Sequence, residues 1–122
     1  MIFALPYHDP DGRYNAVFVK NLPTLKRIFS KIFISVTPST YLQNKKFVDL
    51  LSSEGVVVYK NKKNSNIGDH FRKALSISLK NVEDEEIIFY SFIDRVLFIL
   101  ESEHKDKLLD DLKKTSTKKL TV

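Results

Sequence analysis

The sequence contains no cysteine, and no apolar run approaches the roughly 18 residues that a membrane-spanning helix needs. The absence of cysteine excludes a disulfide-stabilised scaffold, thiolate zinc sites and cysteine catalysis. The first residues, MIFALPYHDP, lack a basic region and reach proline and charge at once, unlike a secretory signal peptide. Together these absences favour a cytoplasmic protein.

Glycine is scarce, with three in the whole chain. The dinucleotide-binding pattern GxGxxG and the phosphate-binding loop GxxxxGK[ST] are both absent. The pattern GxSxG is absent too, and no Ser, His and Asp follow in the order of a hydrolase triad, so hydrolase chemistry has no support.

The 122 residues are 43% hydrophobic and 29% charged, which is typical of one globular domain. The net charge of +5 comes mostly from residues 113–122, which hold four lysines and no acid. The remaining residues carry 16 basic and 15 acidic side chains. We therefore expect an α/β domain over residues 1–112, followed by a basic flexible tail over residues 113–122.

The near-neutral body makes nucleic acid an unlikely partner, because backbone binding needs many cations on one face. Lysines do gather in two short clusters, which could attract phosphate or simply form a solvated face. No aromatic residues interleave with them in the way that base stacking needs. The clusters are Lys45 and Lys46, and Lys60, Lys62 and Lys63.

Apolar runs alternate with segments of helical spacing along the chain. The runs are apolar throughout, which is typical of parallel strands covered on both faces. The pattern predicts a three-layer α/β/α, Rossmann-like, mostly parallel sheet of about four strands in the order 3-2-1-4. The expected strands are residues 2–5, 31–36, 56–59 and 86–91, with helices around Leu22 to Phe29, from Ser39 or Thr40 to Glu54, from Asn66 to about Lys80, and from Lys105 to Lys114.

Ligands of such sheets bind at the carboxyl ends of the strands, which are here the segments 6–12, 37–40, 60–69 and 91–95. The segment after the first strand is the most polar of these ends. A backbone amide, the Tyr7 ring and the carboxylates of Asp9 and Asp11 could hold a nucleotide base and ribose. His8 with Asp9 and Asp11 could also bind a divalent cation. The alternative is a plain surface turn at Pro10-Asp11-Gly12.

Two other strand ends carry candidate residues. Gly68 and Asp69 open the third predicted helix, with Arg72 one turn further on, so that an anion could bind there; a well-capped structural helix is the alternative. Asp94 follows the fourth strand and could contact a metal or a sugar hydroxyl, or only a neighbouring cation on the surface.

Four motifs, "ALPYHDPDGR", "ISVTPST", "NIGDHFRKAL" and "IIFYSFIDRVL", carry a resemblance to a known family. In this order, over about residues 1–100, the chain resembles the N-terminal half of GT-A type nucleotide-diphospho-sugar transferases. It is most similar to a poorly characterised group of bacterial and archaeal glycosyltransferase-like proteins. Their D-x-D-R segment matches here except that Phe92 replaces the first aspartate.

The resemblance implies a nucleotide-sugar site on the carboxyl edge of the sheet. Asp94 would match the second aspartate and help to hold Mn²⁺ or Mg²⁺ and the diphosphate. The missing first aspartate implies that binding could survive without full transfer activity. The residues that the resemblance places at the nucleotide are Leu5, Pro6, Tyr7, His8, Asp9, Gly68, Asp69, Arg72 and Asp94.

Two functions of different classes follow. The first is a nucleotide- or nucleotide-sugar-binding, glycosyltransferase-like domain, truncated or inactive alone. The second is a non-catalytic interaction module that forms a homo-oligomer through the edge at the fourth strand. Apolar residues near that edge favour the second function: Ile87, Phe89, Phe92 and Phe98.

Overall fold

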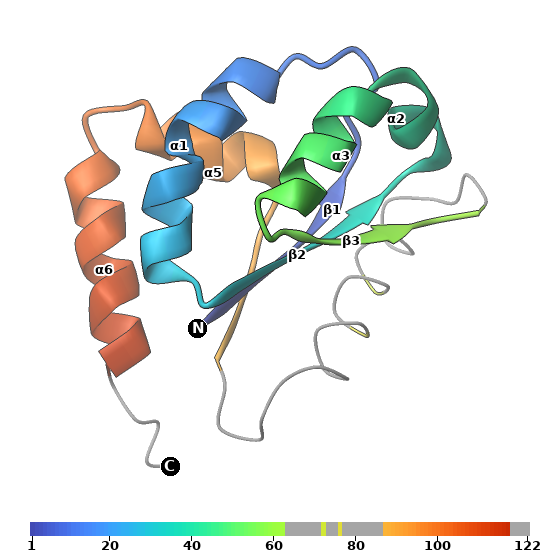
Figure 1. Ribbon diagram of the computed structural model, residues 1–122. Coiled ribbons are helices and arrows are strands. Elements are labelled where there is room, and N and C mark those ends of the chain that lie inside the picture. Colours follow the sequence, from blue (N-terminus) through green and yellow to red (C-terminus); the bar gives the residue numbers. More distant parts are fainter. Residues whose placement is uncertain (63–71, 73–75, 77–86, 118–122) are drawn as a thin grey trace.

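In the computed structural model, the residues described are 1–62, 72, 76 and 87–117. They form a four-stranded, all-parallel sheet in the order β3-β2-β1-β4, as predicted, with helices packed around it in a small Rossmann-like α/β fold (Figure 1). The elements are β1 (Ile2–Tyr7), α1 (Asn15–Ile28), β2 (Lys31–Val36), α2 (Pro38–Gln43), α3 (Lys45–Ser53), β3 (Val57–Lys60), β4 (Ile88–Tyr90), α5 (Ile93–Leu100) and α6 (Lys105–Thr117).

The first strand lies in the middle of the sheet and is buried along its whole length. Phe3, Leu5 and Tyr7 face α1, α3 and α5, which cover the same side of the sheet (Figure 1). Ile2 and Ala4, which point to the opposite side, are also buried. Burial on both faces explains why this strand is apolar throughout rather than alternating.

The carboxyl end of β1 has a neighbour on one side only. Ala4 pairs with Tyr90, the last residue of β4, whereas Pro6 and Tyr7 pair only with β2. Pro6 is therefore tolerated in a central strand, at a point where the ladder towards β4 has already ended. The strand does not stop before Pro6 as its apolar run suggested, but continues to Tyr7.

The predicted second helix is in fact two helices. Thr37, rather than Ser39 or Thr40, is the N-cap of α2, and its side chain accepts from the Thr40 N–H. The chain leaves helical geometry at Asn44, where φ is −124° and ψ is 33°. As predicted, Gly55 follows the end of α3, with the positive φ of +92° that favours glycine there.

Two further boundaries differ from prediction. The first helix begins at Asn15, so Pro23 lies inside α1 and not in its first turn. The fourth strand is shorter than residues 86–91, and the apolar segment after it forms α5. Asp94 consequently lies in the first turn of a helix and not at the tip of a strand.

The C-terminal region differs from the predicted tail. Residues 113–117 belong to α6, which extends past Lys114 to Thr117, and residues 118–122 lie outside the described part. Lys114 pairs with Asp110 one helical turn earlier, at 3.0 Å, which is consistent with a helix there. The predicted helix from Asn66 to about Lys80 lies outside the described residues, apart from helical Arg72 and Ser76.

Candidate functional site

The loop after β1 is held by the carboxylate of Asp9. Its Oδ1 accepts from the Arg13 N–H and its Oδ2 from the Tyr14 N–H, both at 2.9 Å. Arg13 and Tyr14 directly precede α1, so the carboxylate lies near the N-terminus of this helix, where negative charge complements the helix dipole. Asp9 is only 3% exposed. Each of its oxygens thus accepts a backbone hydrogen bond that holds the loop, and Asp9 is not among the residues that line the pocket described below.

A chain of hydroxyl groups joins this loop to the end of β2. The Asp9 N–H donates to Thr40 Oγ1 at 2.9 Å, and Thr40 Oγ1 lies 2.7 Å from Thr37 Oγ1. Thr37 Oγ1 in turn lies 2.8 Å from His8 Nδ1. If each hydroxyl donates to the next group, His8 Nδ1 is an acceptor and the ring proton of neutral His8 lies on Nε2. His8 is the exposed end of this network.

A pocket of about 370 Å³ opens between the carboxyl ends of β1 and β4. The chain leaves β1 towards β2 on one side, and β4 lies on the other side, so the pocket is at the topological switch point of the sheet. This is where ligands bind in open α/β sheets. The pocket is lined by Pro6, Tyr7, His8, Tyr14, Thr37, Phe92, Ile93, Asp94 and Arg95.

The pocket contains cationic and anionic groups together. Arg95 and Asp94 are exposed neighbours in the first turn of α5, and the Arg95 guanidinium lies over the Phe92 ring, 5.6 Å from its centroid. Phe92 is the N-cap of α5 and supplies no side-chain cap. The first N–H groups of α5 therefore add partial positive charge at the wall formed by Phe92 and Ile93.

Tyr7 forms part of the pocket from beneath. Its side chain is fully buried and packs edge-on against Phe18, 5.9 Å between ring centroids. Its hydroxyl lies close enough to the Asp9 carboxylate to interact with it, but the two groups do not form a hydrogen bond of good geometry. Burial raises the pKa of Tyr7 above its usual range, and the negative charge of Asp9 raises it further. The hydroxyl is thus a neutral group at any physiological pH.

The structure brings together four of the predicted nucleotide-binding residues, namely Pro6, Tyr7, His8 and Asp94. Leu5 is a core residue with no exposed surface and does not line the pocket. Arg72 is helical and exposed but is not part of the pocket lining. Gly68 and Asp69 lie outside the described residues.

Sequence reasoning missed several lining residues as contributors to the site. The rule of strand ends had already indicated the segments that contain Thr37, Phe92 and Arg95, so that a signal existed for them. Tyr14 had none, because it lies before α1 in sequence and reaches the pocket only through the fold of the loop.

Asp94, the residue predicted to hold a metal ion, lines the pocket. Among the described residues, no three His, Asp or Glu side chains lie close enough to hold a metal ion. Asp94 is the one carboxylate in the lining of the pocket as described. A single carboxylate fits the way in which Mg²⁺ binds together with substrate phosphates, and does not fit a cage made by the protein alone.

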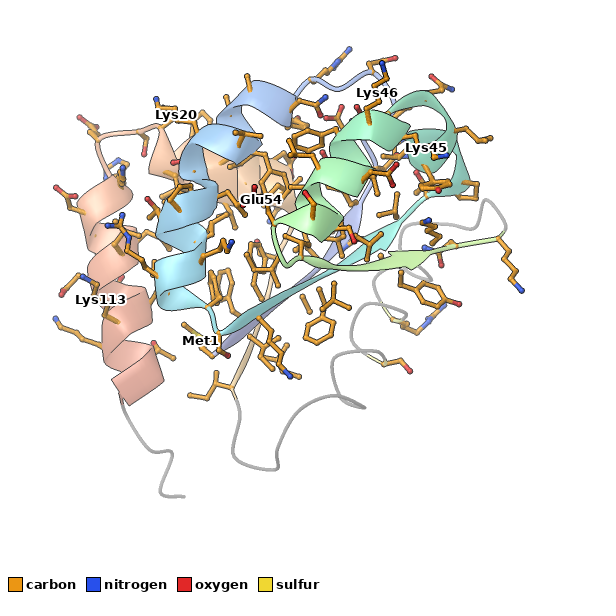
Figure 2. All side chains as sticks on the ribbon, viewed as in Figure 1. Met1, Lys20, Lys45, Lys46, Glu54 and Lys113 are labelled. Carbon is orange, nitrogen blue, oxygen red and sulfur yellow. The ribbon has the colours of Figure 1, made fainter. Side chains whose placement is uncertain are left out.

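The lysine clusters lie elsewhere on the molecule. Lys45 and Lys46 begin α3, at the far side of the structure from Lys113 (Figure 2). Lys60 Nζ donates to the Tyr41 hydroxyl at 2.8 Å and lies 4.0 Å from the ring centroid, and Lys45 lies 5.8 Å from the same centroid. Two of the lysines are thus engaged with one tyrosine, and Lys63 lies outside the described residues.

Comparison with protein-family profiles, with curated protein sequences and with solved structures finds no match for this chain. Over the described residues, no helix combines the length and the hydropathy needed to cross a membrane.

Proposed function

We propose that this chain is a nucleotide- or nucleotide-sugar-binding domain of glycosyltransferase type. The observation that supports the proposal is the pocket of about 370 Å³ at the switch point of the sheet, with a few polar groups converging on it. Its volume is within the range of small-ligand sites.

Different residues of the pocket are suited to different parts of a nucleotide sugar. The Arg95 guanidinium is a donor suited to phosphate oxygens, as is His8 Nε2 in the tautomer that carries its proton there, and the first N–H groups of α5 add to the positive potential. Asp94 only accepts hydrogen bonds when ionised, which suits a ribose or sugar hydroxyl. Tyr14 and Phe92 supply the apolar surface beside these groups.

In this proposal Mn²⁺ or Mg²⁺ binds only together with the nucleotide ligand. Such a cation would be held by Asp94 and the phosphates, and would neutralise the charge of a departing diphosphate. The described lining offers no second carboxylate to act as a base. The proposal is accordingly one of binding, and transfer chemistry by this chain alone is not part of it.

A thermal-shift and calorimetry panel tests the proposal with UDP, GDP, CDP and their sugar conjugates, each with and without Mn²⁺ or Mg²⁺. A ligand at 100 times its dissociation constant adds about 2.7 kcal/mol of stability, which is a shift of several degrees. We expect one nucleotide to stabilise the chain and Arg95→Ala to weaken its binding about tenfold or more, since a charge-assisted bond contributes about 1.5–3 kcal/mol.

Arg27→Ala is the matched control, because Arg27 is an exposed arginine of α1 that does not line the pocket. A flat panel with every nucleotide would refute the proposal. So would a nucleotide whose affinity falls equally in Arg95→Ala and Arg27→Ala, because binding would then follow net charge and not the pocket.

Self-association is a second proposal of a different class, supported by the position of β4. In the described sheet β4 is an edge strand, and Ile88 and Phe89 are half-exposed. Phe89 also packs within the fold, 5.5 Å from the Phe3 ring and 5.7 Å from the Phe29 ring. Sedimentation equilibrium tests it: a monomer mass at high concentration would count against pairing through this edge.

A further inference from the structure

A second and larger depression adjoins the nucleotide pocket. It measures about 810 Å³ and runs between α1 and α5. It shares Tyr14, Asp94 and Arg95 with the pocket, so the two are continuous around the first turn of α5. We call it the α1–α5 groove. Its lining is Tyr14, Val17, Asp94, Arg95, Leu97, Phe98, Ile99, Glu101 and Ser102.

The middle of this groove is apolar. Leu97 forms its buried floor, and Val17 and Ile99 are half-buried along it. Phe98 is 77% exposed, although large aromatic side chains are normally covered. From Asp94 to Glu101 the helix axis rises about 10 Å, which is long enough for an extended apolar chain.

The polar groups at the far end of the groove already have partners. Glu101 accepts from Lys20 Nζ and from Asn21 Nδ2, each at 2.9 Å, and Lys20 lies beside this end of α5 (Figure 2). Ser102 Oγ donates to the Ile99 carbonyl at 2.7 Å. Recognition of a polar ligand group therefore falls to Asp94 and Arg95, at the end that opens into the nucleotide pocket.

From this polarity we infer that the site takes an amphiphile: an anionic group binds beside Arg95, and an apolar chain lies along the α1–α5 groove over Leu97 and Phe98. The inference rests on the proposed function in one respect only, that the same pocket holds the anionic end.

Calorimetry with the full chain tests this inference, using inorganic phosphate and then butyl, hexyl and octyl phosphate below their micelle concentrations. We expect the affinity to rise about two- to fourfold for each added methylene until the groove is filled, since the groove is open on one side. In Phe98→Ala the dependence on chain length should flatten, while the affinity for inorganic phosphate stays unchanged.

Two control variants make the result specific. Leu42→Ala removes an equally exposed apolar side chain, 79% exposed, that does not line the groove, and should leave the series unchanged. Phe98→Leu should restore much of the dependence, because it restores apolar area. A slope that is the same in wild type and Phe98→Ala would overturn the inference, because it would indicate non-specific adsorption.

The remaining outcomes separate this inference from the proposed function. Nucleotide binding with no gain from the alkyl chain would overturn the groove and leave the nucleotide site intact. A chain-length dependence without nucleotide binding would overturn the nucleotide site and leave the groove intact. A dimer in sedimentation that Phe98→Ala dissociates, and that octyl phosphate does not, would overturn the inference in favour of a second copy in the groove.

Discussion

The side-chain amides of Asn15 and Asn44 donate to each other's oxygen atoms, at 2.9 Å in both directions. The pair connects the first residue of α1 to the residue that separates α2 from α3. Asn44 Nδ2 also donates to the Asp9 carbonyl at 3.1 Å. Three chain segments that surround the candidate site are thus fixed by two amide groups.

We expect the side-chain amides of Asn15 and Asn44 to stabilise the fold jointly. Two partly buried neutral hydrogen bonds should give a coupling free energy of about 1–2 kcal/mol between Asn15→Ala and Asn44→Ala. The measurement is a double-mutant cycle by urea denaturation. Asn44→Ala alone should be the more destabilising variant, because it also removes the bond to Asp9. Additive effects of the two substitutions would show that the pair does not couple.

Asp9 should contribute to stability and not to ligand contact. Asp9→Ala leaves the Arg13 and Tyr14 N–H groups without an acceptor, and we expect a loss of about 2–3 kcal/mol in the free energy of unfolding. Asp9→Asn keeps one acceptor and should lose less. At a temperature where Asp9→Asn is folded, its nucleotide affinity should match wild type. A large loss of affinity in folded Asp9→Asn would restore a direct role.

Sequence reasoning succeeded for the central strands of the sheet and failed for the break between α2 and α3. The apolar runs at residues 2–5 and 31–36 predicted the two central strands, and their lack of alternation predicted a parallel sheet. The break at Asn44 has no local signal, because it depends on side-chain bonds to Asn15 and Asp9, which are distant in sequence.

The segment that forms α5 could not be assigned for a different reason. Apart from Asp94 and Arg95 it is almost continuously apolar, so its period does not distinguish a buried strand from a buried helix. The rule of strand ends still placed residues 91–95 at the site, since it depends on topology alone. By contrast, Asp9 carried a missed signal: an aspartate before a Pro-Asp-Gly turn often accepts backbone hydrogen bonds from the residues that follow, as it does here from Arg13 and Tyr14.

Tyr7→Phe should leave the protein as stable as wild type or stabilise it by about 1 kcal/mol, because it removes a buried hydroxyl that makes no hydrogen bond of good geometry, even to the nearby Asp9 carboxylate. The variant should also resist alkali better. The pKa of Tyr7 is raised, so its stability contribution is complete below the usual value of 10.0 and is lost as the pH rises towards the folded-state value. Denaturation midpoints at neutral pH and above pH 10 measure both effects, and a clear loss at neutral pH would show that the hydroxyl is bonded.

Glu101 should make stability sensitive to acid. The hydrogen bonds from Lys20 and Asn21 lower the pKa of its carboxyl below the usual 4.5. A lowered folded-state pKa gives a contribution that is present above 4.5 and is lost as the pH falls through the folded-state value. The difference in denaturation midpoint between wild type and Glu101→Gln should therefore shrink below pH 4.5. Glu103→Gln is the control, since Glu103 is 86% exposed, lies 3.6 Å from His104 Nε2 and takes no part in the hydrogen bonds from Lys20 and Asn21.

Substitution of Asp94 tests whether a cation binds together with the nucleotide phosphates. Mn²⁺ or Mg²⁺ alone should leave the melting temperature unchanged, because the described residues contain no group of three ligating side chains. A diphosphate nucleotide should bind more tightly with the cation than without it, since the phosphates complete the coordination. Asp94→Ala should abolish this difference, and Asp94→Glu should keep part of it.

The control for this test is Asp49→Ala, an exposed aspartate of α3 that does not line the pocket. Calorimetry of each variant, with and without Mn²⁺, separates the cation effect from direct binding. If Asp94→Ala binds the nucleotide more tightly than wild type does and gains no affinity from Mn²⁺, the Asp94 carboxylate merely repels the phosphates. If Asp94→Ala keeps the full effect of Mn²⁺, the cation is bound by other residues, and the role assigned to Asp94 is wrong.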